Sequence, residues 1–157
     1  MIMTDYQNNT WTAPNGESPA IAYLSRVGEL DRQIRLKKSR LGILRDALSL
    51  RSPVMSDMPK APSPSLQSME DRLSEILTLE DEIKAMEQKM VILKAEIMGV
   101  ISRIEDATLQ MVLVQCFLNL RSNSQACKDL HFSRCWFIRL KSQALEVLEQ
   151  VLHQKGV

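Results

Sequence analysis

The side chains best suited to binding a metal or attacking a substrate lie in the last third of the chain. They are three cysteines and two histidines: Cys116, Cys127, His131, Cys135 and His153. Structural zinc sites take Cys and His ligands in closely spaced pairs, and this sequence has no CxxC pair. We therefore expect reduced thiols that fill space in a core, with no metal and no cofactor.

Carboxylates are the second group of side chains that could take part in catalysis. They cluster at residues 70–71 and 80–82, inside a long stretch with helical periodicity. Acidic runs in such a stretch are typical of the solvated faces of a coiled coil. The sequence contains no glycine-rich phosphate loop, no HExxH zinc motif and no nucleophile elbow. An enzyme is therefore not expected.

Composition favours helices. The 157 residues include 20 basic and 19 acidic side chains, 4% aromatic residues and only five glycines. β-Sandwiches and barrels depend on aromatic side chains and glycine-rich turns, so a β fold is disfavoured. No run approaches the roughly 18–20 apolar residues that span a bilayer, and the polar N-terminus lacks an apolar signal core. We expect an all-α protein that stays in the cytoplasm, with no membrane partner.

Prolines mark the end of an N-terminal tail and the loop between two long helices. Residues 1–17 are polar and are expected to form a disordered tail, in which Tyr6 and Trp11 are loose or docked. Four prolines fall within residues 52–65, which suit a loop between two antiparallel helices. The predicted organisation is a tail, a long antiparallel coiled-coil hairpin over 18–102 and a helix-turn-helix domain over 103–157.

Both arms of the predicted hairpin carry an apolar seam with steps of three and four residues, which is typical of a coiled coil. Ser18 is expected to cap the first arm, with Pro19 in its first turn. The seam of the first arm comprises Tyr23, Val27, Leu30, Ile34, Leu41, Leu44 and Leu48. The seam of the second arm comprises Leu66, Met69, Leu73, Ile76, Leu79, Ile83, Met86, Met90, Leu93, Ile97, Val100 and Ile104.

The two arms carry opposite charge. Residues 20–51 have eight basic and three acidic side chains, a net charge of +5, and residues 66–98 have four basic and eight acidic ones, a net charge of −4. The cations of the first arm either face the acidic arm or bind phosphate, and the near-complete compensation favours the first reading. Because an isolated two-helix hairpin has little core, we also expect a homodimer.

The C-terminal unit is predicted to contain a helix near 106–120, a short helix over 125–130 and a last helix over 134–152. Ser122 or Ser124 can cap the short helix, and Ser133 can cap the last one. The stripe of the first helix is Leu109, Val112, Leu113, Cys116, Phe117 and Leu120, and that of the last is Phe137, Leu140, Ala144, Leu145, Leu148, Val151 and Leu152. This outline is typical of a helix-turn-helix unit.

The stretch 124–145 resembles region 4 of bacterial σ70-type factors, in which a recognition helix follows a small turn. Ser133–Arg134 match the cap, Phe137 and Leu140 the core positions, and Ala144–Leu145 the closing pair. Residues 20–150 also resemble small phage and prophage proteins of Gram-positive bacteria, which join a helical hairpin to a degenerate unit of this kind. Those proteins are associated with the regulation of late genes.

The resemblance implies double-stranded DNA as a ligand, RNA polymerase or another host protein as a partner, and a bacterial host cytoplasm as the location. Arg134 and Arg139 would face the major groove and reach guanine edges or phosphates. The implied DNA-binding residues are Ser133, Arg134, Trp136, Arg139, Lys128 and Arg121, the last two through the DNA backbone.

The sequence departs from the family pattern at two places. His131 occupies a turn position usually held by Gly or Asp, and Trp136, at a usually polar position, is either a contact residue or packed on the hairpin. Residues 103–157 have seven basic and five acidic side chains, a net charge of +2, which is low for a DNA-binding domain. The alternative is a non-enzymatic phage protein that binds and inhibits a host or defence protein through its hairpin or its degenerate helix-turn-helix.

Overall fold

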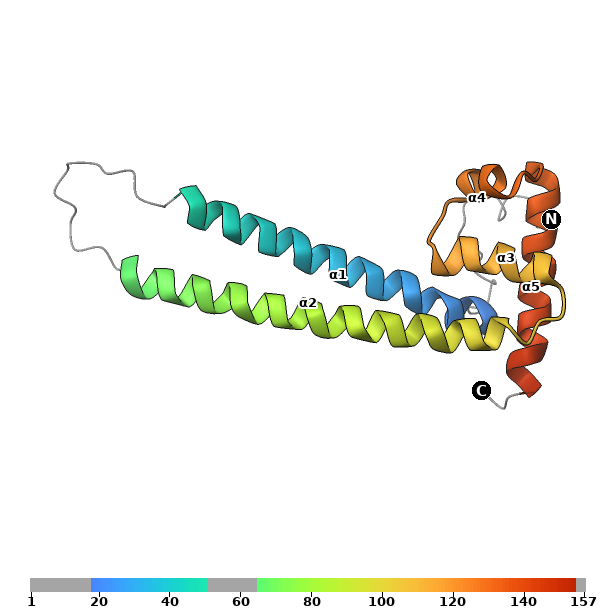
Figure 1. Ribbon diagram of the computed structural model, residues 1–157, viewed down its shortest axis with the longest axis horizontal. Helices are drawn as coiled ribbons and strands as arrows, with labels where there is room; N and C mark the ends of the chain where they lie inside the picture. Colours follow the sequence, from blue (N-terminus) through green and yellow to red (C-terminus); the bar gives the residue numbers. More distant parts are fainter. Residues whose placement is uncertain (1–17, 51–64, 155–157) are drawn as a thin grey trace. The chain divides into compact units, whose positions relative to one another are not determined.

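The computed structural model describes residues 18–50 and 65–154. Within these ranges the chain forms helices and short connections, and no strand occurs in them. In chain order the elements are α1 (Pro19–Leu50), α2 (Ser65–Ile101), α3 (Ala107–Leu113), the π-helical turn η1 (Val114–Leu118), α4 (Asn123–Leu130) and α5 (Arg134–Gln154) (Figure 1). The all-α fold class is therefore confirmed. The expected tail 1–17 and nearly all of the expected loop 52–65 lie outside the described residues.

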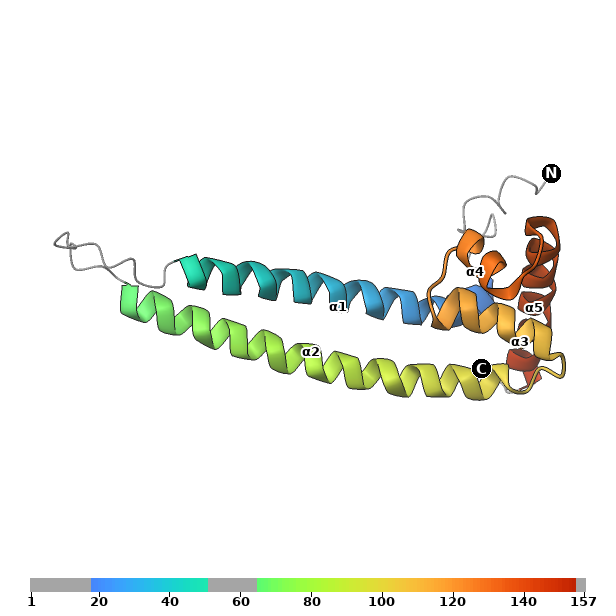
Figure 2. The same cartoon turned by 45° about the horizontal axis from the view of Figure 1, so that its top comes forward.

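The two long helices, α1 and α2, form the predicted antiparallel hairpin, which both ribbon views show (Figures 1 and 2). Pro19 opens α1, where its missing N–H and fixed φ suit the first helical turn. The Ala22 N–H donates to the Ser18 carbonyl at 2.9 Å, and the Ser18 hydroxyl donates to the carboxylate of Glu149 on α5. The start of α1 is therefore attached to the last helix.

Contacts within the chain define two compact units. One unit joins the chain up to Glu29 with everything from Val91 onward, and the other comprises Leu30–Met90. The first unit thus contains the beginning of α1, the end of α2 and all of the shorter helices. The expected boundary between 102 and 103 stays a prediction.

The 30–90 unit is a two-helix coiled coil with a narrow apolar seam. Its buried residues are Ile34, Leu41, Ile76, Leu79, Ile83 and Met90, all of which belong to the predicted seams. Leu44 and Leu48 pack against this cluster and are partly buried. Burial of these side chains supplies most of the stability of the hairpin, at about 25 cal/mol per Å² of apolar surface.

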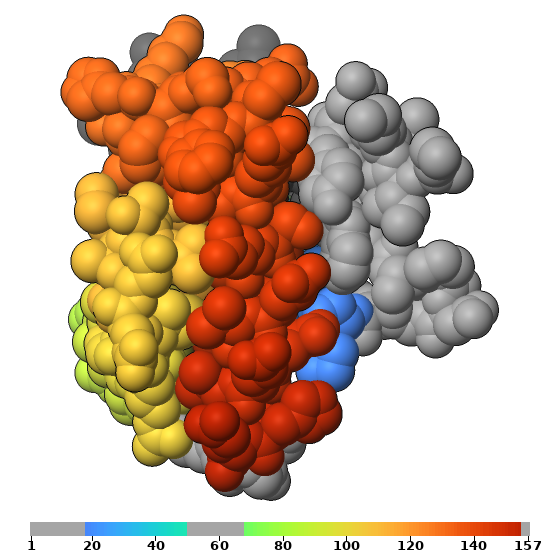
Figure 3. Space-filling view, turned by 90° about the vertical axis from the view of Figure 1, so that its right-hand side faces the viewer, coloured from blue at the N-terminus to red at the C-terminus, as the bar shows by residue number. Residues whose placement is uncertain are grey.

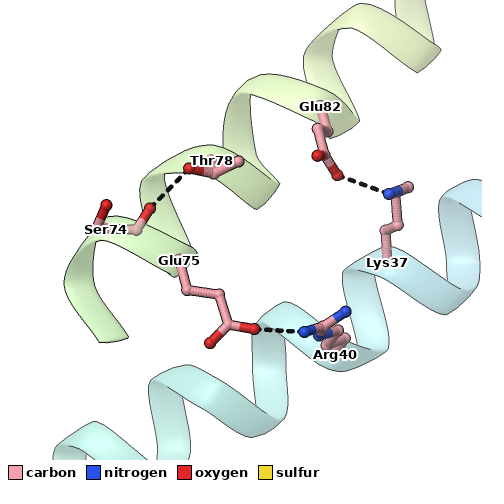
Figure 4. Close-up of polar contacts among 6 residues, drawn as sticks. All are labelled: Lys37, Arg40, Ser74, Glu75, Thr78 and Glu82. Atoms are coloured by element: carbon pink, nitrogen blue, oxygen red, sulfur yellow. Dashed lines mark hydrogen bonds and ion pairs between the residues drawn. The ribbon is translucent and has the colours of Figure 1, made fainter. Parts of the chain in front are cut away.

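Ion pairs border the seam, always with the cation on α1 and the anion on α2. Lys37 Nζ lies 2.6 Å from Glu82 Oε2, and Arg40 pairs with Glu75, as Figure 4 shows. In the same view the Thr78 hydroxyl donates to the Ser74 carbonyl at 2.9 Å. These pairs fix the register of the two helices, although each exposed pair adds only about 0–1 kcal/mol.

Two predicted seam positions of α2 are exposed instead. Met69 and Leu73 retain 39% and 44% of their accessible surface. Since Arg45 pairs with Glu80, positions seven and eleven residues before Glu80 lie opposite positions beyond Leu50, where α1 ends. The apolar pattern of α2 therefore continues past the end of its partner helix.

Near the start of α1 the seam is shifted by one residue. Leu24 is fully buried, whereas the predicted Tyr23 is only partly covered. The Tyr23 hydroxyl donates to Glu96 Oε1 at 3.3 Å, and the Arg26 guanidinium lies 4.4 Å from the centre of the tyrosine ring. Partial burial, with Glu96 nearby, raises the pKa of Tyr23. An aromatic side chain with a polar end therefore borders the core here, and a leucine fills it.

The C-terminal helices enclose a second core. Phe137 and Leu148 are fully buried on α5, as are Val112 and Leu113 on α3, and these two helices pack side by side (Figure 3). All predicted apolar positions of α5 are buried except Val151, which is partly buried.

The helix predicted over 106–120 is interrupted. α3 ends at Leu113, and η1 follows with wider π-helical bonds, of which Asn119 N–H to Val114 O is 2.9 Å long. Leu120 then takes a left-handed backbone with φ of 54° and remains 36% exposed, so its predicted place in the stripe was wrong. A π-helical turn holds more residues than an α-helical turn, so the spacing of the stripe does not continue to Leu120.

Candidate nucleic-acid interface

A short helix, a three-residue turn and a long helix make up the part of the chain that carries the candidate site. Ser122 caps α4 and accepts from the Gln125 N–H at 3.2 Å, so Ser122 and not Ser124 fills the predicted capping role. The helix ends at His131, which has a left-handed backbone with φ of 58°. The Phe132 N–H donates back to the Cys127 carbonyl at 3.0 Å, which closes the turn.

Ser133 begins the last helix as predicted. Its hydroxyl accepts from the Trp136 N–H at 3.3 Å, and the Phe137 N–H donates to its carbonyl at 2.9 Å. Four residues from the turn, Phe137 is completely buried and anchors this end of α5 in the core. The residues just before it therefore project from a fixed helix end.

Three cations border this helix end and point into solvent. Arg134 and Arg139 on α5 and Lys128 on α4 are exposed. Within the described part of the chain, no hydrogen bond or ion pair engages their side chains. The N-terminal end of α5 adds the positive end of its helix dipole to this group. The surface is therefore suited to an anionic ligand.

The other two predicted contact residues differ in their surroundings. Trp136 keeps 50% of its accessible surface, so a large aromatic side chain is exposed on the first turn of α5. Arg121, which was expected to contact a DNA backbone, has its Nε 3.1 Å from Asp129 Oδ2 on α4. Lys128, Arg134, Trp136 and Arg139 are therefore all exposed, whereas Arg121 is held in an ion pair.

Gln143 is a polar residue that the sequence reasoning missed. It lies one helical turn beyond Arg139 on α5 and is exposed. An amide at this position can donate to and accept from an adenine edge. The spacing Trp136, Arg139, Gln143 has steps of three and four residues, the signal that one exposed strip of the helix carries all three.

The half-buried Lys141 on α5 contacts residues of α4 and η1. Lys141 Nζ donates to Asn123 Oδ1 at 3.1 Å and lies 5.4 Å from the centre of the Phe117 ring. Desolvation lowers the pKa of Lys141 and raises that of the neighbouring Cys116 thiol to about 11. Asn123 begins α4, so this contact fixes the position of α4 against α5.

The cations of the hairpin are arranged differently from those near the turn. Arg26, Lys37, Lys38, Arg40 and Arg45 each lie within ion-pair distance of a glutamate on α2. Arg35 pairs with Asp31 on its own helix at 2.7 Å. The basic charge of α1 is therefore largely compensated within the hairpin.

Residues 18–50 and 65–154 contain neither a metal-binding cluster nor a membrane-spanning helix. No group of three or more His, Cys, Asp or Glu side chains there is arranged to hold a metal ion. Cys127 is buried, Cys116 is half-buried and Cys135 is exposed, all three as free thiols. None of the described helices is long and apolar enough to cross a membrane.

Comparison with known families gives a match over residues 50–149, to the DUF1492 family, a group of proteins of unknown function. The chain belongs to this family. The DUF1492 match takes in α2, α3, η1, α4 and most of α5, so the turn that presents Arg134 lies inside the family region. No curated protein and no solved structure matches the chain.

Proposed function

We propose that this DUF1492 protein binds double-stranded DNA through α5, which enters the major groove as the recognition helix of a σ-region-4-like helix-turn-helix. Arg134, Arg139 and Gln143 would meet the bases or phosphates, Trp136 would contact base edges, and Lys128 would contact a phosphate. The biological role would be transcription regulation in a phage or prophage, with RNA polymerase as a second partner. No catalytic role is proposed.

One observation carries the proposal. Lys128, Arg134 and Arg139 project into solvent around the start of α5 without an ion-pair partner in the described chain, whereas the hairpin cations named above are paired. A cation without a partner lowers the energy of a nearby phosphate more than one that is already neutralised. The regulatory role and the polymerase partner rest only on the resemblance to σ factors and phage proteins.

The direct test is retention of a labelled 30-base-pair duplex at about 50 mM salt, where counterion release is strongest. We expect the double variant R134A/R139A to lose retention while its helical circular dichroism is unchanged. R26A/R40A is the matched control, because it also removes two exposed arginines but leaves the α5 surface intact. Retention of the duplex by R134A/R139A at the wild-type level would overturn the proposal.

The second candidate is a protein-binding role, which the half-exposed Trp136 favours. Large aromatic side chains are enriched at the centres of protein interfaces. In a pull-down from a bacterial lysate treated with nuclease, a partner that persists with wild type and is lost with W136A would support this reading. A partner that disappears on nuclease treatment would support DNA binding instead.

A further inference from the structure

We propose that one side of the 30–90 coiled coil, which we call the groove face, is the contact surface for a second copy of this chain. The proposal does not depend on DNA binding. It rests on a groove, on exposed leucines beside the groove and on the opposite charges of the two helices.

The groove runs between α1 and α2 and has a volume of about 600 Å³. Its apolar floor consists of Leu41 and Ile83. Gly42 forms part of its α1 wall, and a Cβ built there would meet nothing within 4 Å. Because the missing side chain leaves the floor uncovered, the groove is open to a side chain from another molecule.

Two ion pairs form the rims of the groove. Lys38 Nζ lies 2.7 Å from Glu87 Oε1, and Arg45 pairs with Glu80. All four side chains are substantially exposed. The α1 rim of the groove is therefore basic along this stretch, whereas the α2 rim carries both glutamates and Lys84 and is acidic by one net charge.

Exposed leucines extend the groove face toward the end of α1. Leu73 and Leu77 on α2 keep 44% and 61% of their accessible surface. With Glu80 and Glu87 they fall at steps of three, four and seven residues along α2, so they share one strip of the helix. On α1, Leu48 is only partly buried at this level. Apolar surface therefore continues beyond the groove.

The charge pattern selects the arrangement of two copies. When two groove faces meet across a twofold axis parallel to the helices, α1 of each copy lies over α2 of the other, and basic rims face acidic rims. The other face-to-face arrangement, with α1 over α1, brings like charges together and is disfavoured. The favoured contact is isologous, so it closes as a dimer.

This arrangement also places the leucines at one level. Leu48 lies three residues after Arg45, and Leu77 lies three residues before its partner Glu80, so the two share a level of the antiparallel pair. A twofold axis parallel to the helices keeps that level, and the four side chains of two copies meet in one apolar layer. Such layers form the cores of four-helix bundles.

The opposite side of the coiled coil supplies a matched control. Leu36 and Ile43 are 72% and 69% exposed, and they lie four residues before and three residues after Arg40. Arg40 pairs with Glu75 away from the groove, so these residues belong to the other side. Ile43 is therefore as exposed and apolar as Leu77 but lies outside the proposed contact.

The test is sedimentation equilibrium of the full chain from 1 to 100 μM. We expect wild type to approach twice the 17.9 kDa mass of one chain, and the dissociation constant of L77E to rise at least about tenfold. G42R should act in the same way, because its side chain fits the open groove of one chain but occupies the space of the second. I43E should leave the dissociation constant unchanged.

Three outcomes would overturn the proposal. Wild type that remains a single chain at 100 μM excludes this self-association. A dimer that I43E disrupts and L77E does not would place the contact on the other side. Equal dimerisation of wild type, L77E and G42R would place it elsewhere in the chain. Thermal melting of each variant shows whether the hairpin is folded, so that loss of the dimer is not confused with unfolding.

Discussion

The left-handed backbone at His131 ends α4 and fixes the turn before α5. With φ of 58°, a side chain here is crowded against its own backbone, a cost that glycine avoids. We expect H131G to raise the free energy of unfolding by about 0.5–1 kcal/mol, measured by urea denaturation. H131V should lower it, since a β-branched residue tolerates this conformation poorly. A fall in stability for H131G would mean that the imidazole itself holds the turn.

The three thiols should differ sharply in reactivity. Cys135 is exposed, whereas desolvation raises the pKa of Cys116 to about 11 and also raises that of Cys127. Since the thiolate is the nucleophile, iodoacetamide at pH 8 should label Cys135 first and the other two slowly. Labelling of Cys116 should keep accelerating as the pH rises toward 11. Peptide mass spectrometry over time measures the order, and equal rates in the folded chain would contradict this view of the core.

Single residues also mark the limit of what the sequence predicts. Ser133, Phe137 and Leu140 were placed correctly, because caps and apolar spacing are local signals. The π-helical turn was not, since its wider bonds have no sequence pattern of their own. Gln143 was missed because its exposure depends on which side of α5 the rest of the fold covers.

At the scale of the elements, the cap of α5 decides how firmly the candidate DNA-binding surface is held. Ser133 accepts the Trp136 N–H, and Ala at a cap position typically costs about 1 kcal/mol. We expect S133A to lose about that much stability and S124A, whose hydroxyl caps no helix, to lose almost none. Urea denaturation of both variants compares them, and equal losses would contradict the capping role.

In the hairpin, apolar contacts and ion pairs contribute different amounts to the free energy of unfolding. Ile83 is 6% exposed in the seam, and removal of such a side chain costs about 2–5 kcal/mol, whereas an exposed pair such as Arg45 with Glu80 contributes less than about 1 kcal/mol. We therefore expect I83A to destabilise the chain several times more than R45A. Thermal unfolding at two salt concentrations measures both effects, and only the smaller one should depend on salt.

The heptad pattern predicted the hairpin because apolar spacing is set along one helix. It did not reveal that Met69 and Leu73 would be exposed, since that depends on where the opposite helix ends. It also did not predict the exposed Leu77 and Ile43, which lie outside the seam. Exposure of an apolar residue is a property of two elements together, and one sequence pattern describes only one of them.

At the scale of the whole molecule, the net charge of +1 is the sum of parts whose cations have different surroundings. Most cations of α1 are paired within the hairpin, whereas Lys128 on α4 and Arg134 and Arg139 on α5 have no ion-pair partner in the described chain. Three cations per chain are few for tight DNA binding, because each phosphate contact contributes through release of a counterion. A dimer that presents two such surfaces would double the number of phosphate contacts. One measurement of duplex binding therefore tests both proposals.

The measured quantity is the slope of log K against log salt concentration for duplex binding. With about 0.9 ions released per contact, three contacts predict a slope of about −2.7 for one chain and about −5 for a dimer bound through both copies. We expect wild type near the steeper value and L77E near the shallower one, with I43E matching wild type. If all three proteins share the shallow slope, wild type contacts no more phosphates than the single chain of L77E. DNA would then be bound by one copy even if the dimer forms.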